Sequence, residues 1–186
     1  MESLEHSVHE ILIGQASTLR VVFVLAKRCN RQQVVSIINE VSAERIYLQT
    51  DQYRSTEVWE RLLEEGYNFR DRFALFVVKY KQVIIGFGRL SPDLRQPLSG
   101  NVGIVLVRAF RSMGIGSALL QLLIDLAIQL GYNKMTADVL ATNARSVKLF
   151  RRFQFVERDI HDFIPFDSPR KIQEITFELD LQTRKV

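Results

Sequence analysis

The stretch from Val102 to Gly131 constrains the fold of this chain of 186 residues more than any other. It begins with an apolar run, Val102–Val107, that is apolar on both faces except at Gly103, which is typical of a central strand. From Ile115 onward, apolar residues recur at helical spacing and leave only a narrow polar strip. A strand and a helix that are both nearly buried need covering layers, which predicts an α/β domain with this helix against a central sheet.

The other periodic segments extend this pattern over the rest of the chain. They predict further strands at 19–26, 73–80, 83–90, 134–139, 155–164 and 172–181, and further helices at 30–48, 55–66 and 143–153. Two residues join the strands within 73–90, which favours an antiparallel hairpin. A right-handed crossover through the long helix is expected to make the 102–107 and 134–139 strands parallel, so the predicted sheet is mixed.

Composition and length indicate one folded domain. The chain is 47% hydrophobic and 25% charged, which excludes intrinsic disorder, and no linker divides it. We expect an N-terminal extension at residues 1–18 and a single domain at 19–186. Within the extension, Ile11-Leu12-Ile13 either adds an edge strand or packs on the surface.

Several functional classes are excluded or disfavoured by residue usage. The single Cys29 excludes a disulfide framework, and with only three histidines no metal site is suggested. No apolar run reaches the ~20 residues of a membrane span, and acidic residues stand where a signal peptide needs cations. We therefore expect a cytoplasmic protein with no membrane partner. The net charge of +4 suits an anionic ligand but not a nucleic-acid-coating surface.

The loop between the central strand and the long helix is the clearest candidate site. Gly114 and Gly116 leave backbone N–H groups uncovered at the start of a helix, where the N–H groups lack internal partners and the dipole is positive. Such a junction suits a phosphate, and Arg108 and Arg111 add charge. The alternative is a plain glycine-containing helix start. Neither a nucleoside-triphosphate loop nor a dinucleotide fingerprint is present.

Two motifs on matching elements resemble those of a known family. Arg111-x-x-Gly114-x-Gly116 is similar to the acyl-CoA-binding motif of the GNAT superfamily of N-acetyltransferases. Downstream, Val139-x-x-x-Asn143, Leu149-Phe150 and Phe153-x-Phe155 are similar to a second motif of that family. The resemblance covers residues 19–181. It implies a GNAT-like, mostly antiparallel mixed sheet with one parallel, splayed pair of strands, flanked by helices.

The resemblance also implies acetyl-CoA, or another acyl-CoA, as cosubstrate. Its pyrophosphate would lie on the N–H groups of residues 111–117, and its pantetheine arm would add to the strand that carries Leu106. The implied cofactor-binding residues are Leu106, Val107, Arg111, Ser112, Met113, Gly114, Ile115, Gly116, Ser117, Asn143 and Phe150. The implied reaction is direct transfer of an acetyl group to an amine of a small molecule or a peptide.

The catalytic residues do not follow the family pattern. Phe150 stands where many relatives have a tyrosine that protonates the leaving thiolate, Gln154 replaces a common glycine, and Asn101 and Gly103 stand where many have a glutamate. Asp138, beside the expected cleft, and His161, on the next strand, are the substitute candidates for acid–base chemistry. Further acidic residues considered for this role are Asp159, Glu40 and Glu44. For all five, an ordinary surface role is the alternative.

Three other features leave alternatives open. Tyr47 and Tyr53 either line an acceptor pocket or serve in packing. The cations Arg145, Lys148, Arg151 and Arg152 reach the cofactor's 3′-phosphate, form a solvated helix face, or bind nucleic acid, which is not the expected partner. The absent tyrosine and glutamate leave room for a module that senses acyl-CoA without turnover. A homodimer is left open.

Overall fold

The computed structural model describes residues 6–13, 17–164 and 171–184, which form one sheet with helices on both faces. The strands are β1 His6–Ile13, β2 Ser17–Leu25, β3 Tyr67–Asn68, β4 Phe73–Tyr80, β5 Val83–Pro92, β6 Ser99–Leu106, β7 Lys134–Leu140, β8 Val156–Phe163 and β9 Ile172–Asp180. The helices are α1 Arg31–Ser42, α2 Glu57–Glu65, α3 Ile115–Gln129 and α4 Ala144–Arg152. The predicted mixed α/β architecture is confirmed.

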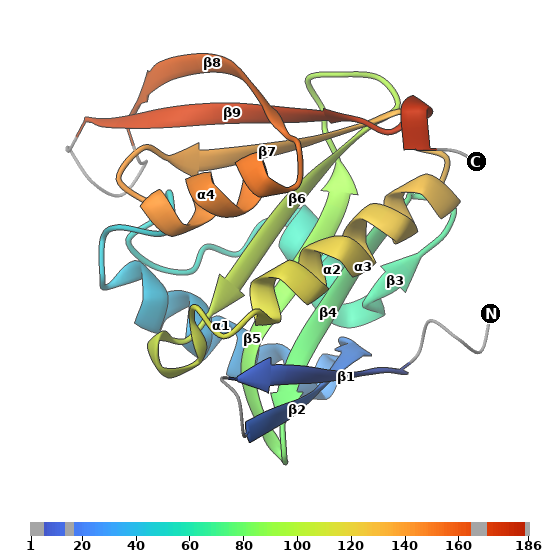
Figure 1. The fold of residues 1–186 in the computed structure, drawn as a ribbon, viewed down its shortest axis with the longest axis vertical. Coiled ribbons are helices and arrows are strands. Elements are labelled where there is room, and N and C mark those ends of the chain that lie inside the picture. Colours follow the sequence, from blue (N-terminus) through green and yellow to red (C-terminus); the bar gives the residue numbers. More distant parts are fainter. Residues whose placement is uncertain (1–5, 14–16, 165–170, 185–186) are drawn as a thin grey trace.

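The sheet runs in the order β1-β2-β4-β5-β6-β7-β9-β8, with β3 paired to β4 at one side. All neighbours are antiparallel except β6 and β7. In Figure 1, α3 and α4 lie in front of the sheet, and α1 and α2 lie behind it. Each pair of helices covers its own apolar core: α3 and Phe150 of α4 pack on one face, and α1 and α2 pack on the other.

The parallel pair opens into a gap. β6 and β7 are paired only from Ser99↔Lys134 to Asn101↔Thr136, although β6 continues to Leu106 and β7 to Leu140. In the part of the chain that the structure describes, residues 102–106 therefore have a strand partner, β5, on one side only. This is the splayed pair that the sequence predicts, and it leaves backbone groups of β6 facing an opening in the sheet.

Glycines fix the long helix against the sheet at two points. Gly114 has a φ of +85°, a left-handed conformation that favours glycine, and it forms the N-cap of α3. Gly88 on β5 faces α3, where a Cβ would lie 2.8 Å from the side chain of Leu119. The helix therefore packs directly on the strand backbone, which is the close approach that a glycine within a strand indicates.

The structure corrects one expected segment end and decides one open alternative. The first helix was expected to reach Leu48, but it ends at Ser42, because the chain turns at Arg45, which has a φ of +55°. The turn directs residues 46–56 into a loop that runs toward α2. Ile11-Leu12-Ile13 belongs to the edge strand β1, which settles the choice between an edge strand and surface packing. The division into residues 1–18 and 19–186 stays a prediction.

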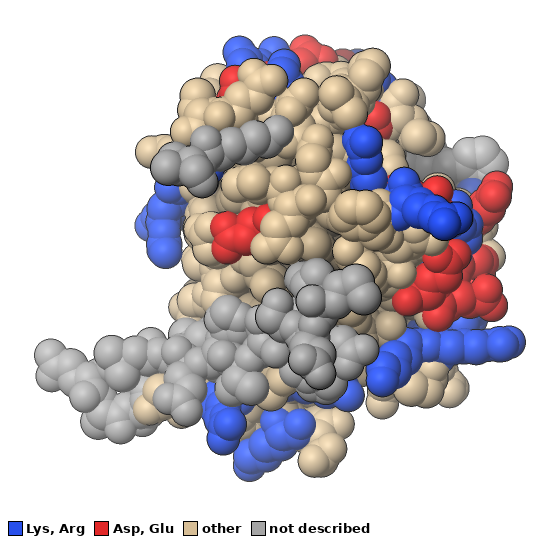
Figure 2. All heavy atoms as spheres, turned by 90° about the vertical axis from the view of Figure 1, so that its right-hand side faces the viewer, with Lys and Arg blue, Asp and Glu red and all other residues tan. Residues whose placement is uncertain are grey.

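Charged side chains of both signs share the surface of the molecule. On the face shown in Figure 2, Lys and Arg are interspersed with Asp and Glu around a mainly uncharged centre, and they do not form one continuous basic surface. None of the described helices has both the length and the apolar character that crossing a bilayer requires.

Candidate active site

A cavity of about 730 Å³ lies at the gap between β6 and β7. The loop after α1, the strands β5 and β6, the start of α3 and the helix α4 contribute to its walls. A second cavity of about 590 Å³ adjoins it, and Arg89, Asn101 and Asp138 line both. The site therefore has two sides, one at the α3–α4 end and one facing α2, which meet at the splayed strands.

The start of α3 provides free backbone donors on the first side. Among the described residues, the N–H groups of 112–116 donate to no protein acceptor, whereas the N–H groups of Arg111 and Ser117 bond to the carbonyls of Arg108 and Gly114. Gly116 lines the cavity, and among the described residues a Cβ there would make ordinary contacts with Leu149, at 3.6 Å, and Leu106, at 3.9 Å. The geometry suits an anionic group that accepts several hydrogen bonds.

The guanidinium of Arg111 binds other protein groups and does not point to the space in front of these N–H groups. Its guanidinium forms an ion pair with Glu44, with N–O distances of 2.9 and 2.6 Å, and its Nε donates to the Leu106 carbonyl at 2.7 Å. The guanidinium also lies 4.2 Å from the ring centre of Tyr47. Burial acts to lower the pKa of Arg111, but the hydrogen bond and the charge of Glu44, together with Tyr47, raise that pKa overall. The residue therefore ties the glycine loop to the end of α1.

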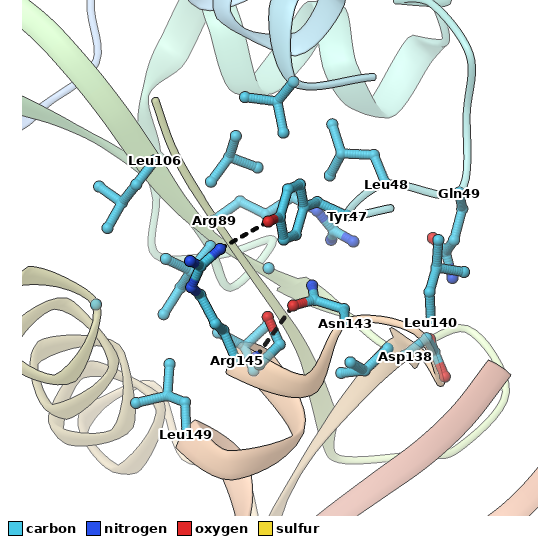
Figure 3. A pocket seen from close by; sticks show the side chains of 18 of the residues that line it. Tyr47, Leu48, Gln49, Arg89, Leu106, Asp138, Leu140, Asn143, Arg145 and Leu149 are labelled. Atoms are coloured by element: carbon cyan, nitrogen blue, oxygen red, sulfur yellow. Dashed lines mark hydrogen bonds between the residues drawn. The ribbon is translucent and has the colours of Figure 1, made fainter. Parts of the chain in front are cut away.

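The four cations of α4 lie on two faces of the helix, as their spacing predicts. Arg145, Lys148 and Arg152 line the cavity, whereas Arg151 forms an ion pair with Glu157 outside it. Arg145 reaches across the cavity and donates to the hydroxyl of Tyr47 at 2.7 Å (Figure 3). Positive charge is thus concentrated at the α4 wall of the cavity.

Most of the expected cofactor-binding residues meet at this cavity. Those that line it are Leu106, Arg111, Ser112, Gly114, Gly116, Ser117, Asn143 and Phe150. Val107, Met113 and Ile115 do not, and Ile115 is fully buried in the core under α3. Asn143 caps α4 by accepting a hydrogen bond from the N–H of Ser146 at 3.1 Å (Figure 3). Phe150 is buried against Phe155 and Phe177.

The two catalytic candidates are separated. Asp138 lines the cavity, and its two oxygens accept four hydrogen bonds at 2.8–3.1 Å, from Arg95 twice and from Asn101 and Thr176. His161 lies outside the cavity, 3.3 Å from both Asp159 and Glu174. Asp138 therefore bridges β7 to the loop after β5, and His161 belongs to a separate cluster of charges on β8 and β9.

Sequence reasoning identified Tyr47 and Tyr53 as lining candidates, and both line the cavity. It missed Arg89, which lies behind Tyr47 in the view of Figure 3. Arg89 is a charged residue within an otherwise apolar strand, and it pairs in register with Gly103, which has no side chain. This charged interruption of an apolar run is the signal that could have identified it. Gln49 and Trp59, also missed, carry no comparable signal.

The cavity at the gap between β6 and β7, with free backbone N–H groups at the start of α3, is typical of a protein that binds an anionic cofactor. The model of the acetyltransferase (GNAT) family matches residues 35–155, so the chain belongs to this family. It is an acetyltransferase that uses acetyl-CoA. No curated protein matches the sequence.

Solved structures share the fold at low identity. An N-acetyltransferase from Staphylococcus aureus Mu50 is 23% identical with a TM-score of 0.74, and the match covers 87% of this chain and 98% of that one. A ribosomal-protein-alanine N-acetyltransferase from Brucella melitensis is 20% identical (TM-score 0.73; 86% and 99% covered). A phosphinothricin acetyltransferase from Sinorhizobium meliloti, in complex with acetyl-CoA, is 18% identical (TM-score 0.72; 86% and 88% covered).

Acetyl-CoA fits the residues present. The free N–H groups of 112–116 match the acceptor oxygens of its pyrophosphate, and the one-sided pairing of β6 matches an amide-bearing arm that hydrogen-bonds like a strand. Gly116 lines the same cavity and adds no side chain to it.

Proposed function

We propose that the protein is an N-acetyltransferase that transfers the acetyl group of acetyl-CoA directly to an amine of a small molecule or a peptide. One observation carries this proposal. The free backbone N–H groups of residues 112–116 and the gap between β6 and β7 beyond Asn101 border the same cavity. The names of the N-acetyltransferases that share the fold support an amine acceptor. Action in the cytoplasm, expected from the sequence, is part of the proposal.

Acetyl-CoA supplies an acetyl group on a thioester. The amine nitrogen forms a bond to the carbonyl carbon, the carbon–sulfur bond breaks, the amine loses one proton and the leaving thiolate takes one. An amine of lysine type has a pKa of about 10.4 and must be neutral to attack, so the site must accept a proton. A thiol pKa of about 8.5 makes a protein acid helpful but dispensable at the leaving group.

The residues of this chain would bind and orient rather than exchange protons. The N–H groups of 112–116 would hold the pyrophosphate, and unpaired N–H groups of β6 would stabilise negative charge on the carbonyl oxygen. Phe150 cannot donate a proton, and Asp138 already accepts four hydrogen bonds. Proton transfer to water that enters through the adjoining cavity fits this arrangement.

Release of free CoA tests the proposal. Purified protein with acetyl-CoA is mixed with a panel of amino acids, polyamines, aminoglycosides and peptides, and the free thiol is measured. We expect release above background with at least one amine, together with an acetylated product of matching mass. Tight acetyl-CoA binding with no turnover on any amine would instead favour a sensing module, the alternative that Phe150 supports.

A further inference from the structure

Arg89 lies at the acceptor side of the gap. It is carried by β5 on the sheet face covered by α1 and α2, and it pairs in register with Gly103 of β6. A Cβ on Gly103 would lie 3.3 Å from the Nε of Arg89, so the guanidinium lies over the strand that borders the gap. Arg89 lines both cavities, and a ligand that enters from either one meets it.

The hydrogen-bond partners of Arg89 are neutral. Its terminal nitrogens donate to the Oγ of Ser91 at 2.7 Å and the Oδ1 of Asn101 at 2.8 Å. No carboxylate among the described residues lies within ion-pair distance of it. The neighbouring Arg95, in contrast, pairs with both Asp93 and Asp138. Burial lowers the pKa of Arg89, and the more distant charges of Asp138 and Asp93 act against this.

An arginine in this state favours an anionic ligand. A guanidinium has five N–H groups, of which the bonds to Ser91 and Asn101 occupy two, so three remain for an incoming group. A partly buried cation whose hydrogen-bond partners are neutral gains more from a carboxylate than a fully exposed one does, and guanidinium binds carboxylates in a bidentate manner.

The charged residues that line the larger cavity also favour an anionic ligand. Among the residues that the structure describes, Asp138 is the only acidic one that lines it, and Arg95 already forms an ion pair with Asp138. The cationic lining residues are Arg54, Arg89, Arg111, Arg145, Lys148 and Arg152. Arg111 stands before the start of α3, and the last three stand on α4, so these four are on the cofactor side. Arg89 stands on the side facing α2. The site thus has a second anion-binding position, separate from the one for the cofactor.

Aromatic side chains hold Arg89 in place. Its Cζ lies 6.0 Å from the ring centre of Trp59, and Trp59 packs edge-on against Phe87 at 5.9 Å and Tyr53 at 6.3 Å. The contact with Trp59 orients the guanidinium. These aromatic rings leave an apolar wall beside the charge, suited to the hydrocarbon part of a small ligand.

Position limits the ligand's size. Gly103, which Arg89 covers, lies in the part of β6 that has no partner on the β7 side, and a strand rises ~3.3 Å per residue. We propose, on the basis of the amine transfer proposed above, that Arg89 binds the anionic group of the acceptor, which is a small amine with a carboxylate a few bonds from its nitrogen. Polyamines, internal peptide lysines and peptide N-termini lack that group.

Matched pairs of acceptors test the inference. Each amino acid in the panel is compared with its own amide, so that the two differ only in the carboxylate. We expect kcat/KM at least tenfold higher for the acid than for the amide in the best pair. Equal or better turnover of the amides would overturn the role of Arg89.

Variants separate recognition from folding. In Arg89→Gln, we expect KM for the acid to rise at least tenfold with little change in kcat, while KM for the amide stays as it was. Arg158→Gln, which removes an exposed arginine of β8, is the control and should change neither value. If Arg89→Gln does not fold, Gly103→Ala places a methyl group against the guanidinium and is expected to raise KM for the acid alone. An equal rise for both acceptors would contradict the proposal.

A binding measurement tests the role of Arg89 even if the protein acetylates no amine. If no amine is acetylated, the protein with CoA is titrated calorimetrically with N-acetyl-L-methionine and with N-acetyl-L-methioninamide. At least tenfold tighter binding of the acid, lost in Arg89→Gln, supports the anion site even when transfer fails. Equal binding of the two probes overturns it.

Discussion

Arg111 and Glu44, which are 67 positions apart, form a two-bond ion pair that joins the start of the glycine loop to the turn after α1. The side chain of Arg111 is only 10% exposed, and that of Glu44 is 26% exposed. The loop that offers free N–H groups is therefore held in place by the segment that also carries Tyr47 into the cavity. The glycine loop and the loop after α1 are linked through this pair.

Replacing Glu44 by glutamine is expected to lower the free energy of unfolding by about 1–3 kcal/mol, because it leaves a mostly buried guanidinium without its charge partner. Hydrogen bonding from Arg111 holds the pKa of Glu44 below its ordinary value of 4.5. The stabilisation is thus complete above that value and is lost as the pH falls through the lowered pKa. Urea unfolding between pH 7 and pH 3 measures both effects.

The control for this variant is Glu40→Gln, which removes an exposed carboxylate on the preceding helix. It should leave both the stability and its pH dependence close to those of the unchanged protein. A Glu44→Gln variant as stable as the control, with the same loss of stability in acid, would contradict a structural role for the ion pair.

Gly116→Ala should separate folding from cofactor binding. An added Cβ makes only ordinary contacts, and alanine within a helix is favoured over glycine by about 0.5–1 kcal/mol, so the variant should be slightly more stable. Its methyl group intrudes on the proposed cofactor path, so acetyl-CoA affinity should fall at least tenfold. Calorimetry and thermal unfolding measure the two quantities.

Gly131→Ala is the opposite case at the other end of α3. Its φ of +79° disfavours a side chain, while no atom lies within 4 Å of the added Cβ. It should lose about 1 kcal/mol of stability and keep its acetyl-CoA affinity. If both glycine variants bound acetyl-CoA equally well, the cofactor would not pass over Gly116.

Asp138 and Arg95 should act as one unit. Because each oxygen of Asp138 accepts two hydrogen bonds, we expect a bridging role, in which Asp138→Asn and Arg95→Gln lower kcat by similar, less than tenfold, factors. The double variant should add little to either single one. A loss of a hundredfold or more in Asp138→Asn alone, with loss of the acidic limb of the pH–rate profile, would instead identify Asp138 as the base.

Glu60 should remain charged in strong acid. Hydrogen bonds from Arg31, Ser55 and Tyr53 lower its pKa to about 2. Its contribution to stability is therefore complete above about pH 4.5 and is lost as the pH falls toward about 2. Carbon-detected NMR titration of the Glu60 carboxyl measures this, and Arg31→Ala should raise the midpoint. An identical midpoint in the two proteins would show that Arg31 is not the cause.

The sequence was most informative where a pattern is local. Helical spacing located α3 to within a residue at its start, and the glycines at 114 and 116 located the loop that precedes it. Asn143 was placed at the start of α4 by its motif. These features depend on residues within one or two helical turns, for which spacing and capping are decisive.

The parts that escaped prediction depend on distant contacts. The apolar spacing of the first helix continues to Leu48, yet a turn at Arg45 ends it early, and Arg111 holds the residue just before that turn. Arg89 faces Gly103 only because β5 and β6 pair in that register. Periodicity within one segment does not report which side chains meet across the sheet.

A crystal structure of the complex with acetyl-CoA measures directly where the cofactor binds. We predict the pyrophosphate within hydrogen-bond distance of the N–H groups of residues 112–116, and the thioester in the gap between β6 and β7 beyond Asn101. Acetyl-CoA bound elsewhere on the molecule, with those N–H groups covered by protein side chains, would contradict it.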